Sequence, residues 1–118
     1  MKSIKPFFLS SNKIKAKKAL KILQKKYKHY SLEEANLVIV LGGDGTILPL
    51  VNDKSFIKKN IFGMNRGTVG FLMNNYEAEN LLDRIKSSKV TKLNPVYMKV
   101  TDILNKTHLA FSLNEAAL

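Results

Sequence analysis

The hydrophobic pattern places its clearest element in the middle of the chain, where residues 37–41 read Leu-Val-Ile-Val-Leu. A short unbroken aliphatic run that ends in glycines is typical of a strand buried on both faces of a parallel sheet. Two other short apolar runs, 4–9 and 60–64, predict further strands. Pro6 interrupts the first of them, which places that strand at a sheet edge or moves its start to Phe7.

Helical periodicity fills part of the chain between these strands. Apolar residues recur at three- and four-residue spacing from Asn12 to Tyr27, which predicts a helix with one buried stripe and an N-cap among residues 10–12. Residues 46–52 predict a short helix, provided that Pro49 lies in its first turn. Strands and helices in this order predict an α/β domain.

The strongest helical pattern comes later in the chain. Asn74 and Glu77 have the spacing of a capping pair, and acidic residues precede basic ones along the segment, as the helix dipole favours. An apolar stripe at i, i+3, i+4 and i+7 follows, formed by Ala78, Leu81, Leu82 and Ile85. The pattern predicts a purely structural helix from about Asn74 to Lys89.

The last part of the sequence alternates instead of following a helical period. Apolar residues alternate with others over 96–100 and 109–113, on either side of a polar turn at 105–107, which predicts an antiparallel hairpin. A hairpin with one apolar face needs a partner to bury it. Its exposed surface therefore predicts self-association, and we expect a homo-oligomer.

This change of pattern predicts a domain boundary near residue 92. Residues 1–92 then form an α/β nucleotide-binding domain, and 93–118 open an all-β domain. The sequence stops without a polar tail or a helix stop signal. We therefore expect that the second domain is cut short.

Two predicted strands run directly into glycine-bearing loops. The second loop spans 65–72, and the first consists of Gly42, Gly43, Asp44, Gly45 and Thr46. Open α/β sheets bind ligands at the carboxyl ends of their parallel strands, where such loops meet. Free N–H groups in a glycine loop, and a helix that starts after it, bind phosphate oxygens. We expect a phosphate site here, formed by Gly42, Gly43, Thr46 and Arg66.

Asp44 is the one acid among these glycines. A carboxylate repels phosphate, so its presence suits proton abstraction or metal binding better than phosphate binding itself. The alternative is a tight turn with a solvated Asp, because Asp-Gly is common in turns. For Arg66 the alternative is an ordinary surface arginine on a turn.

Composition narrows the classes of partner. The chain has 118 residues and a formal net charge of +11, which favours an anionic partner such as nucleotide phosphates, nucleic acid or a membrane surface. Lys outnumbers Arg by 18 to 2, however, whereas recognition of phosphates and bases favours Arg. A Lys- and Asn-rich composition also arises from codon bias alone. For the lysines between 13 and 28, the alternative to an electropositive face near an anionic ligand is a solvated outer face.

Metal and membrane sites find little support in the sequence. No cysteine is present, and His29 and His108 lack ligand-like spacing, which argues against disulfides, thiolate sites and a zinc centre. No apolar run is long enough to span a membrane, and the one near the N-terminus is too short for a secretory signal. We expect a cytoplasmic protein without a membrane partner.

Three motifs, in this order, resemble those of the NAD kinases. They are Gly-Gly-Asp-Gly-Thr at 42–46, Gly-Met-Asn-Arg-Gly-Thr-Val-Gly-Phe-Leu at 63–72 and Leu-Asn-Glu at 113–115. Lipid kinases and phosphofructokinases share the core of the first motif, so the second is the discriminating one. The resemblance covers the whole chain but only the first part of a family member. It implies a Rossmann-like, phosphofructokinase-like domain followed by the first strands of an all-β domain.

The resemblance also implies an activity. It is the transfer of the terminal phosphoryl group of ATP, or of polyphosphate, to the 2′-hydroxyl of the adenosine ribose of NAD, which yields NADP. A divalent metal, Mg²⁺, would accompany ATP. By motif position, Asp44 is the catalytic proton acceptor and Gly45 contacts the dinucleotide through its main chain. Where many members carry a basic side chain, five residues after Asp44, this chain has Pro49.

Four further residues match positions that contact NAD in the family. Asn114 and Glu115 match the pair that hydrogen-bonds the dinucleotide, and Phe71 and Leu72 match residues that line the adenine region. Without the family, these residues would be an ordinary polar pair at a strand end and two core residues. The rival interpretation is a non-catalytic remnant of the fold that binds nucleotides or nucleic acid. We expect the chain alone to bind NAD weakly and to turn over little.

Overall fold

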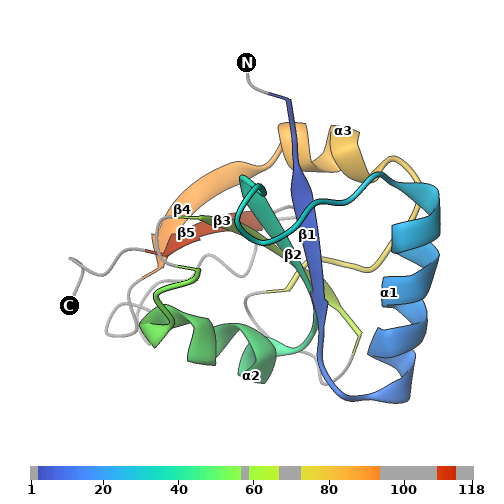
Figure 1. Cartoon of the computed structure of the whole chain (residues 1–118), viewed down its shortest axis with the longest axis horizontal. Helices are drawn as coiled ribbons and strands as arrows, with labels where there is room; N and C mark the ends of the chain where they lie inside the picture. Colours follow the sequence, from blue (N-terminus) through green and yellow to red (C-terminus); the bar gives the residue numbers. More distant parts are fainter. Residues whose placement is uncertain (1–2, 57–58, 67–72, 94–108, 114–118) are drawn as a thin grey trace.

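The computed structural model in Figure 1 describes residues 3–56, 59–66, 73–93 and 109–113. Its elements follow in the order β1 (Pro6–Ser10), α1 (Ile14–Lys26), β2 (Leu37–Gly42), α2 (Asp44–Ile47), the 3-10 helix η1 (Leu48–Asn52), β3 (Asn60–Asn65), α3 (Leu81–Lys86), β4 (Lys89–Leu93) and β5 (Leu109–Leu113). The α/β class is confirmed, and the predicted helix at 46–52 is present as α2 and η1.

The five strands form one sheet in the order β1-β2-β3-β5-β4. β1, β2 and β3 are parallel and end together, since Ser10 pairs with Leu41 and Gly42 pairs with Asn65. β1 lies at the edge of the sheet, as Pro6 predicted. The carboxyl ends of three parallel strands therefore meet at one edge, which is where an open α/β sheet binds ligands.

The C-terminal strands join this sheet. β5 is antiparallel to β3 and parallel to β4, and β4 crosses the boundary predicted near residue 92. The first arm and the turn of the predicted hairpin lie outside the described residues. The described part of the chain thus forms one sheet, and a second, all-β domain stays a prediction.

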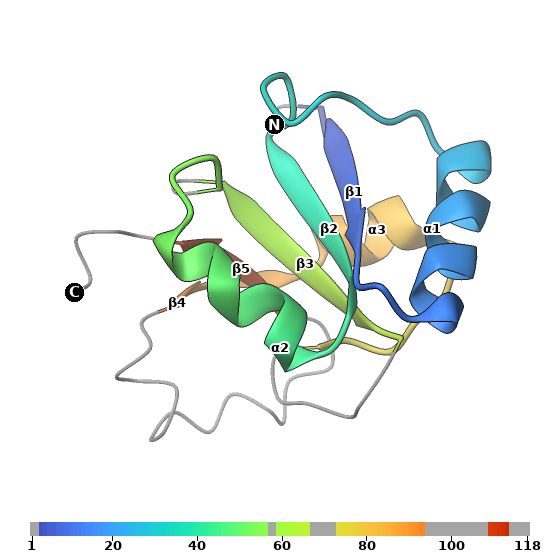
Figure 2. The ribbon, with the colours of Figure 1, turned by 60° about the horizontal axis from the view of Figure 1, so that its bottom comes forward.

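β2 lies at the centre of the core, and all of its residues are buried. Because side chains alternate along a strand, it contributes to both faces of the sheet. On the face covered by α2 and η1, the core consists of Val38, Val40, Ile47, Leu50, Phe56 and Ile61. On the other face, Ile39 and Leu41 pack with residues of α1 and with Leu81 of α3. Figure 2 shows α1 and α2 on opposite sides of the sheet.

Two predicted helix starts were wrong. α1 begins after Lys13, whose side chain makes no capping bond, so none of residues 10–12 is the N-cap. α3 begins only at Leu81, and Asn80 precedes it with a left-handed φ of 57°. Asn74, the predicted cap of that helix, instead forms a β-bridge with Met64 of β3. Tertiary pairing therefore overrides the local helical pattern between residues 74 and 80, and Lys89 begins β4.

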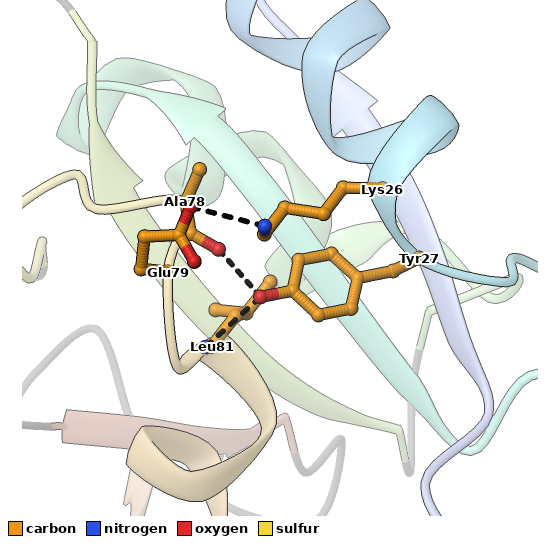
Figure 3. Close-up of polar contacts among 5 residues, drawn as sticks. All are labelled: Lys26, Tyr27, Ala78, Glu79 and Leu81. Carbon is orange, nitrogen blue, oxygen red and sulfur yellow. Dashed lines mark hydrogen bonds and ion pairs between the residues drawn. The ribbon is translucent and has the colours of Figure 1, made fainter.

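The residues that precede α3 are attached to the end of α1 (Figure 3). The Tyr27 hydroxyl donates a hydrogen bond to the Ala78 carbonyl and accepts one of 3.3 Å from the Leu81 N–H. Beside it, Lys26 Nζ lies 3.0 Å from a carboxylate oxygen of Glu79. The hydrogen bond that the Lys26 ammonium donates to Glu79 raises the pKa of Lys26, but both side chains are exposed and such pairs contribute little to stability.

Tyr27→Phe is expected to lower the free energy of unfolding by about 1–2 kcal/mol. The ring keeps its packing, whereas the Ala78 carbonyl and the Leu81 N–H lose the hydroxyl that joins them. Urea unfolding followed by circular dichroism measures the change. Tyr30→Phe is the matched control, because the Tyr30 hydroxyl makes no hydrogen bond within the described residues, and equal losses in both variants would contradict this role of Tyr27.

Candidate functional site

The predicted loops begin side by side at the carboxyl edge of the sheet. Hydrogen bonding between the strands continues past their ends, because the Ser11 N–H donates to the Leu41 carbonyl at 2.9 Å and the Arg66 N–H donates to the Gly42 carbonyl at 2.8 Å. Arg66 is thereby fixed next to the start of the glycine loop. The proximity predicted from the two strand-to-loop junctions is confirmed.

The glycine loop closes into a tight turn through Thr46. The Thr46 N–H donates to the Gly43 carbonyl at 2.9 Å, and the Gly43 N–H donates to Thr46 Oγ1 at 3.4 Å. A Cβ on Gly42 would overlap the Thr46 side chain and would lie 3.2 Å from the Ser11 Cβ. Only glycine fits at position 42. Gly42 therefore has a structural role, whether or not it also contacts a ligand.

Asp44 and Gly45 form the accessible part of this turn. Asp44 is the first residue of α2 and is half-buried, and its carbonyl accepts a hydrogen bond from the Leu48 N–H. Gly45 is exposed, and a Cβ built on it would meet nothing within 4 Å. A ligand therefore has free access to the main chain at Gly45, one residue from a carboxylate.

The second loop is anchored by a buried asparagine. Asn74 is 3% exposed, and its side-chain Nδ2 donates to the Gly63 carbonyl at 2.9 Å. The Asn74 N–H donates to the same carbonyl, and the Asn65 N–H donates to the Asn74 carbonyl, both at 2.8 Å. These bonds hold the segment after residue 72 against the end of β3. Nothing in the sequence distinguished this role from that of a helix cap.

Arg66, in the second loop, is bonded through its main chain to the start of the glycine loop. Its Nε donates to the Asn65 carbonyl at 3.0 Å, and its guanidinium carbon lies 4.2 Å from the centre of the Tyr76 ring. Cation–π stacking of this kind fixes the plane of a guanidinium while its edges stay accessible. Tyr76 was not among the predicted site residues.

The structure thus brings together six of the predicted site residues, namely Gly42, Gly43, Asp44, Gly45, Thr46 and Arg66. Phe71, Leu72, Asn114 and Glu115 lie outside the described residues, so their contacts with NAD stay predictions. Pro49 is exposed in η1 and supplies no charge to the turn.

A metal ion has few ligands available at this edge. No group of three His, Cys, Asp or Glu side chains that could hold a metal ion occurs in the part of the chain that the structure describes. Mg²⁺ is commonly bound by one or two carboxylates together with substrate phosphates and water. Asp44, half-buried and next to the exposed Gly45, fits that mode of binding.

Three parallel strands, helices on both faces and a glycine loop at the carboxyl edge define an α/β domain of the class that binds ligands at that edge. A family model described as the ATP-NAD kinase N-terminal domain matches residues 7–89. The chain belongs to the NAD kinase family.

Curated relatives agree with this assignment. The chain is 40% identical to an NAD kinase of Hyphomonas neptunium over 111 residues, which cover 94% of the chain and 44% of the relative. The NAD kinase of Mesorhizobium japonicum is also 40% identical over 94% of the chain, and that of Rickettsia canadensis is 36% identical over 81%. The chain thus spans less than half the length of these relatives. No solved structure gave a significant match.

None of the helices described above has the length and hydropathy that crossing a membrane requires.

Proposed function

We propose that the chain provides the catalytic base and the phosphate loop of an NAD kinase, which phosphorylates the 2′-hydroxyl of the adenosine ribose of NAD to give NADP. The observation that carries this proposal is the position of Asp44 in the β2–α2 turn, beside the exposed main chain of Gly45. The family and its relatives, which are named as NAD kinases, support the same activity. The phosphoryl donor is ATP or polyphosphate, and the protein acts in the cytoplasm.

In the proposed reaction, the ribose 2′-oxygen forms a bond to the terminal phosphorus of the donor. With ATP, the bond between that phosphorus and the bridging oxygen breaks, and ADP leaves with the bonding electrons. The 2′-hydroxyl proton passes to the Asp44 carboxylate, which holds the hydroxyl in line with the phosphorus. Catalysis of phosphoryl transfer rests mainly on such positioning and on charge stabilisation, to which Mg²⁺ bound with ATP contributes.

The remaining predicted residues have supporting roles. The main chain of Gly45 contacts the dinucleotide. Gly42, Gly43 and Thr46 hold the shape of the phosphate loop, whose N–H groups bind the phosphate oxygens. From the family motifs, Asn114 and Glu115 hydrogen-bond NAD, and Phe71 and Leu72 line the adenine region.

We also propose that copies of the chain associate with one another, and light scattering tests this.

The test of the proposed function is formation of NADP from NAD, ATP and Mg²⁺. The 118-residue chain is assayed beside the same chain extended through any downstream reading frame. We expect little or no turnover by the short chain and clear turnover by the extended one. Failure of both to form NADP, in samples shown by circular dichroism to be folded, would contradict the proposal.

The net charge of +11 favours one rival function, the binding of nucleic acid. Nucleic-acid affinity falls steeply with salt because counterions are released on binding. We expect measurable NAD binding whose affinity changes only modestly between about 50 and 200 mM salt. Oligonucleotides bound more tightly than NAD at the higher salt concentration would favour the rival.

A further inference from the structure

The only two arginines of the chain contact the same short segment. Arg66 stacks on the ring of Tyr76 at 4.2 Å. Arg84, on α3, donates from Nη1 to the Glu77 carbonyl at 3.1 Å and from Nη2 to the Asn75 carbonyl at 2.7 Å. The carbonyls of the two residues that flank Tyr76 are therefore held by one guanidinium.

Arg84 is an unusual residue to find in a core. The residue is 8% exposed, and its buried Nε has no hydrogen-bond partner within the described part of the chain. Within the described residues no carboxylate pairs with it, although the Phe62 ring lies 5.8 Å away. Burying a permanent charge without an ion pair is costly, and an apolar side chain would fill the same space more favourably. What the guanidinium adds is a rigid fork that reaches two carbonyls at once, which a Lys ammonium cannot do in the same way.

The segment that Arg84 holds has no regular secondary structure of its own. Residues 75–77 belong to no helix or strand, so their carbonyls need partners from elsewhere. Asn74 fixes the start of the segment through its bonds to Gly63, and Arg84 fixes the next residues. The backbone that carries Tyr76 is thus attached both to the sheet and to α3.

Tyr76 in turn determines where the Arg66 guanidinium lies. The Arg66 Nε donates to the Asn65 carbonyl, and the stacked ring fixes the guanidinium plane. Its two terminal nitrogens have no hydrogen-bond partner within the described residues. The Arg66 main chain is bonded to Gly42 at 2.8 Å. The Arg66 guanidinium is therefore held by Tyr76 and by the Asn65 carbonyl, and its main chain is bonded to the start of the glycine turn.

We propose that Arg84 and Tyr76 are positioning residues that hold the Arg66 guanidinium ready to bind a phosphate group. Two parallel N–H donors on one guanidinium edge match two phosphate oxygens. This inference deepens the proposed function and rests on it for the source of the phosphate, which is either the dinucleotide or the phosphoryl donor. Holding Arg66 in place before binding saves the entropy of ordering a long side chain.

A first experiment reads the arginines directly by NMR. With only two arginines, the ¹⁵N-labelled chain gives two Nε–Hε signals, and Arg66→Lys identifies the first. Titration with tripolyphosphate, ATP and NAD is expected to shift the Arg66 signal and to leave the Arg84 signal in place. The ligand that acts at the lowest concentration identifies the source of the phosphate. An Arg66 signal that responds to none of the three would overturn the inference.

Variants then test the positioning itself. Tyr76→Leu is expected to move the Arg66 signal and to weaken ATP or NAD binding about threefold to tenfold, whereas Tyr76→Phe keeps the ring and restores both. Arg84→Lys is expected to move the Arg66 signal although Arg84 bonds to the segment that carries Tyr76 and not to Arg66 itself. Tyr30→Leu is the matched control, because it removes a half-buried ring that lies 5.3 Å from the Lys28 ammonium.

A double-mutant cycle separates positioning from a general loss of structure. If Tyr76 acts through Arg66, adding Tyr76→Leu to Arg66→Ala causes no further loss of affinity. Additive losses in the double variant would contradict the positioning role. The NMR response is independent of turnover. If the Arg66 signal responds to phosphate but no NADP forms, the positioning role of Tyr76 and Arg84 stands and the proposed function fails.

Discussion

Asp44→Asn is expected to lower the rate of NADP formation by about 10²- to 10⁴-fold, the range typical of a positioned general base. Asn has nearly the same shape as Asp but cannot accept the proton of the ribose hydroxyl. The rate is measured with NAD, ATP and Mg²⁺, in the 118-residue chain if it is active and otherwise in the extended chain. Because shape is kept, we expect NAD affinity to change much less than the rate.

The matched control for this substitution is Asp53→Asn. Asp53 is exposed just after η1, and its Oδ1 accepts a hydrogen bond of 2.9 Å from the Ser55 N–H, which an Asn oxygen also accepts. We expect Asp53→Asn to leave the rate unchanged. Equal rates in the Asp44 variant and the control would show that Asp44 is not the catalytic base and that its role is limited to the structure of the turn.

Gly42→Ala is expected to lower the free energy of unfolding by about 1–3 kcal/mol, because the added methyl group overlaps Thr46 and crowds Ser11 in a packed turn. The change is measured by urea unfolding. Since the Gly42 carbonyl also accepts the Arg66 N–H, strain at this residue reaches the second loop. NAD binding is therefore expected to weaken together with stability.

Gly45→Ala is the informative comparison. It makes the same substitution three residues later, in a helical turn where a Cβ meets open space. Stability is expected to stay constant or to rise by up to about 1 kcal/mol, as for Gly→Ala in helices. NAD binding is nonetheless expected to weaken if the dinucleotide lies against the main chain there. A Gly45 variant that binds NAD normally would exclude that contact.

The parallel half of the fold was predictable because its signals are local. Each element can be predicted from its own residues: β2 from its aliphatic run, α1 from its apolar stripe, and the loop after β2 from its glycines. Topological rules then place the strand ends together, and the Gly42–Arg66 hydrogen bond confirms that placement.

The segment between β3 and α3 was not predictable in the same way. Its capping pair and apolar stripe have the spacing of a helix, yet Asn74 is buried against Gly63 of β3. The competing interaction joins residues 11 positions apart in the sequence, well beyond the three- and four-residue spacing of a helix, so the helical pattern does not reveal it. The same holds for Arg84, since a charged residue in a helical stretch is expected at the surface. Its burial follows only from the packing of α3 under the segment that carries Tyr76.

The central claim is that NAD binds at the carboxyl edge of β2 and β3. The chain contains six glycines, so selective ¹⁵N-glycine labelling gives a simple amide spectrum that includes Gly43 and Gly45 of the turn and Gly63 within β3. Addition of NAD is expected to shift the Gly43 and Gly45 signals progressively while the buried Gly63 signal moves little. NAD binding that leaves Gly43 and Gly45 unshifted would place the dinucleotide elsewhere and contradict the claim.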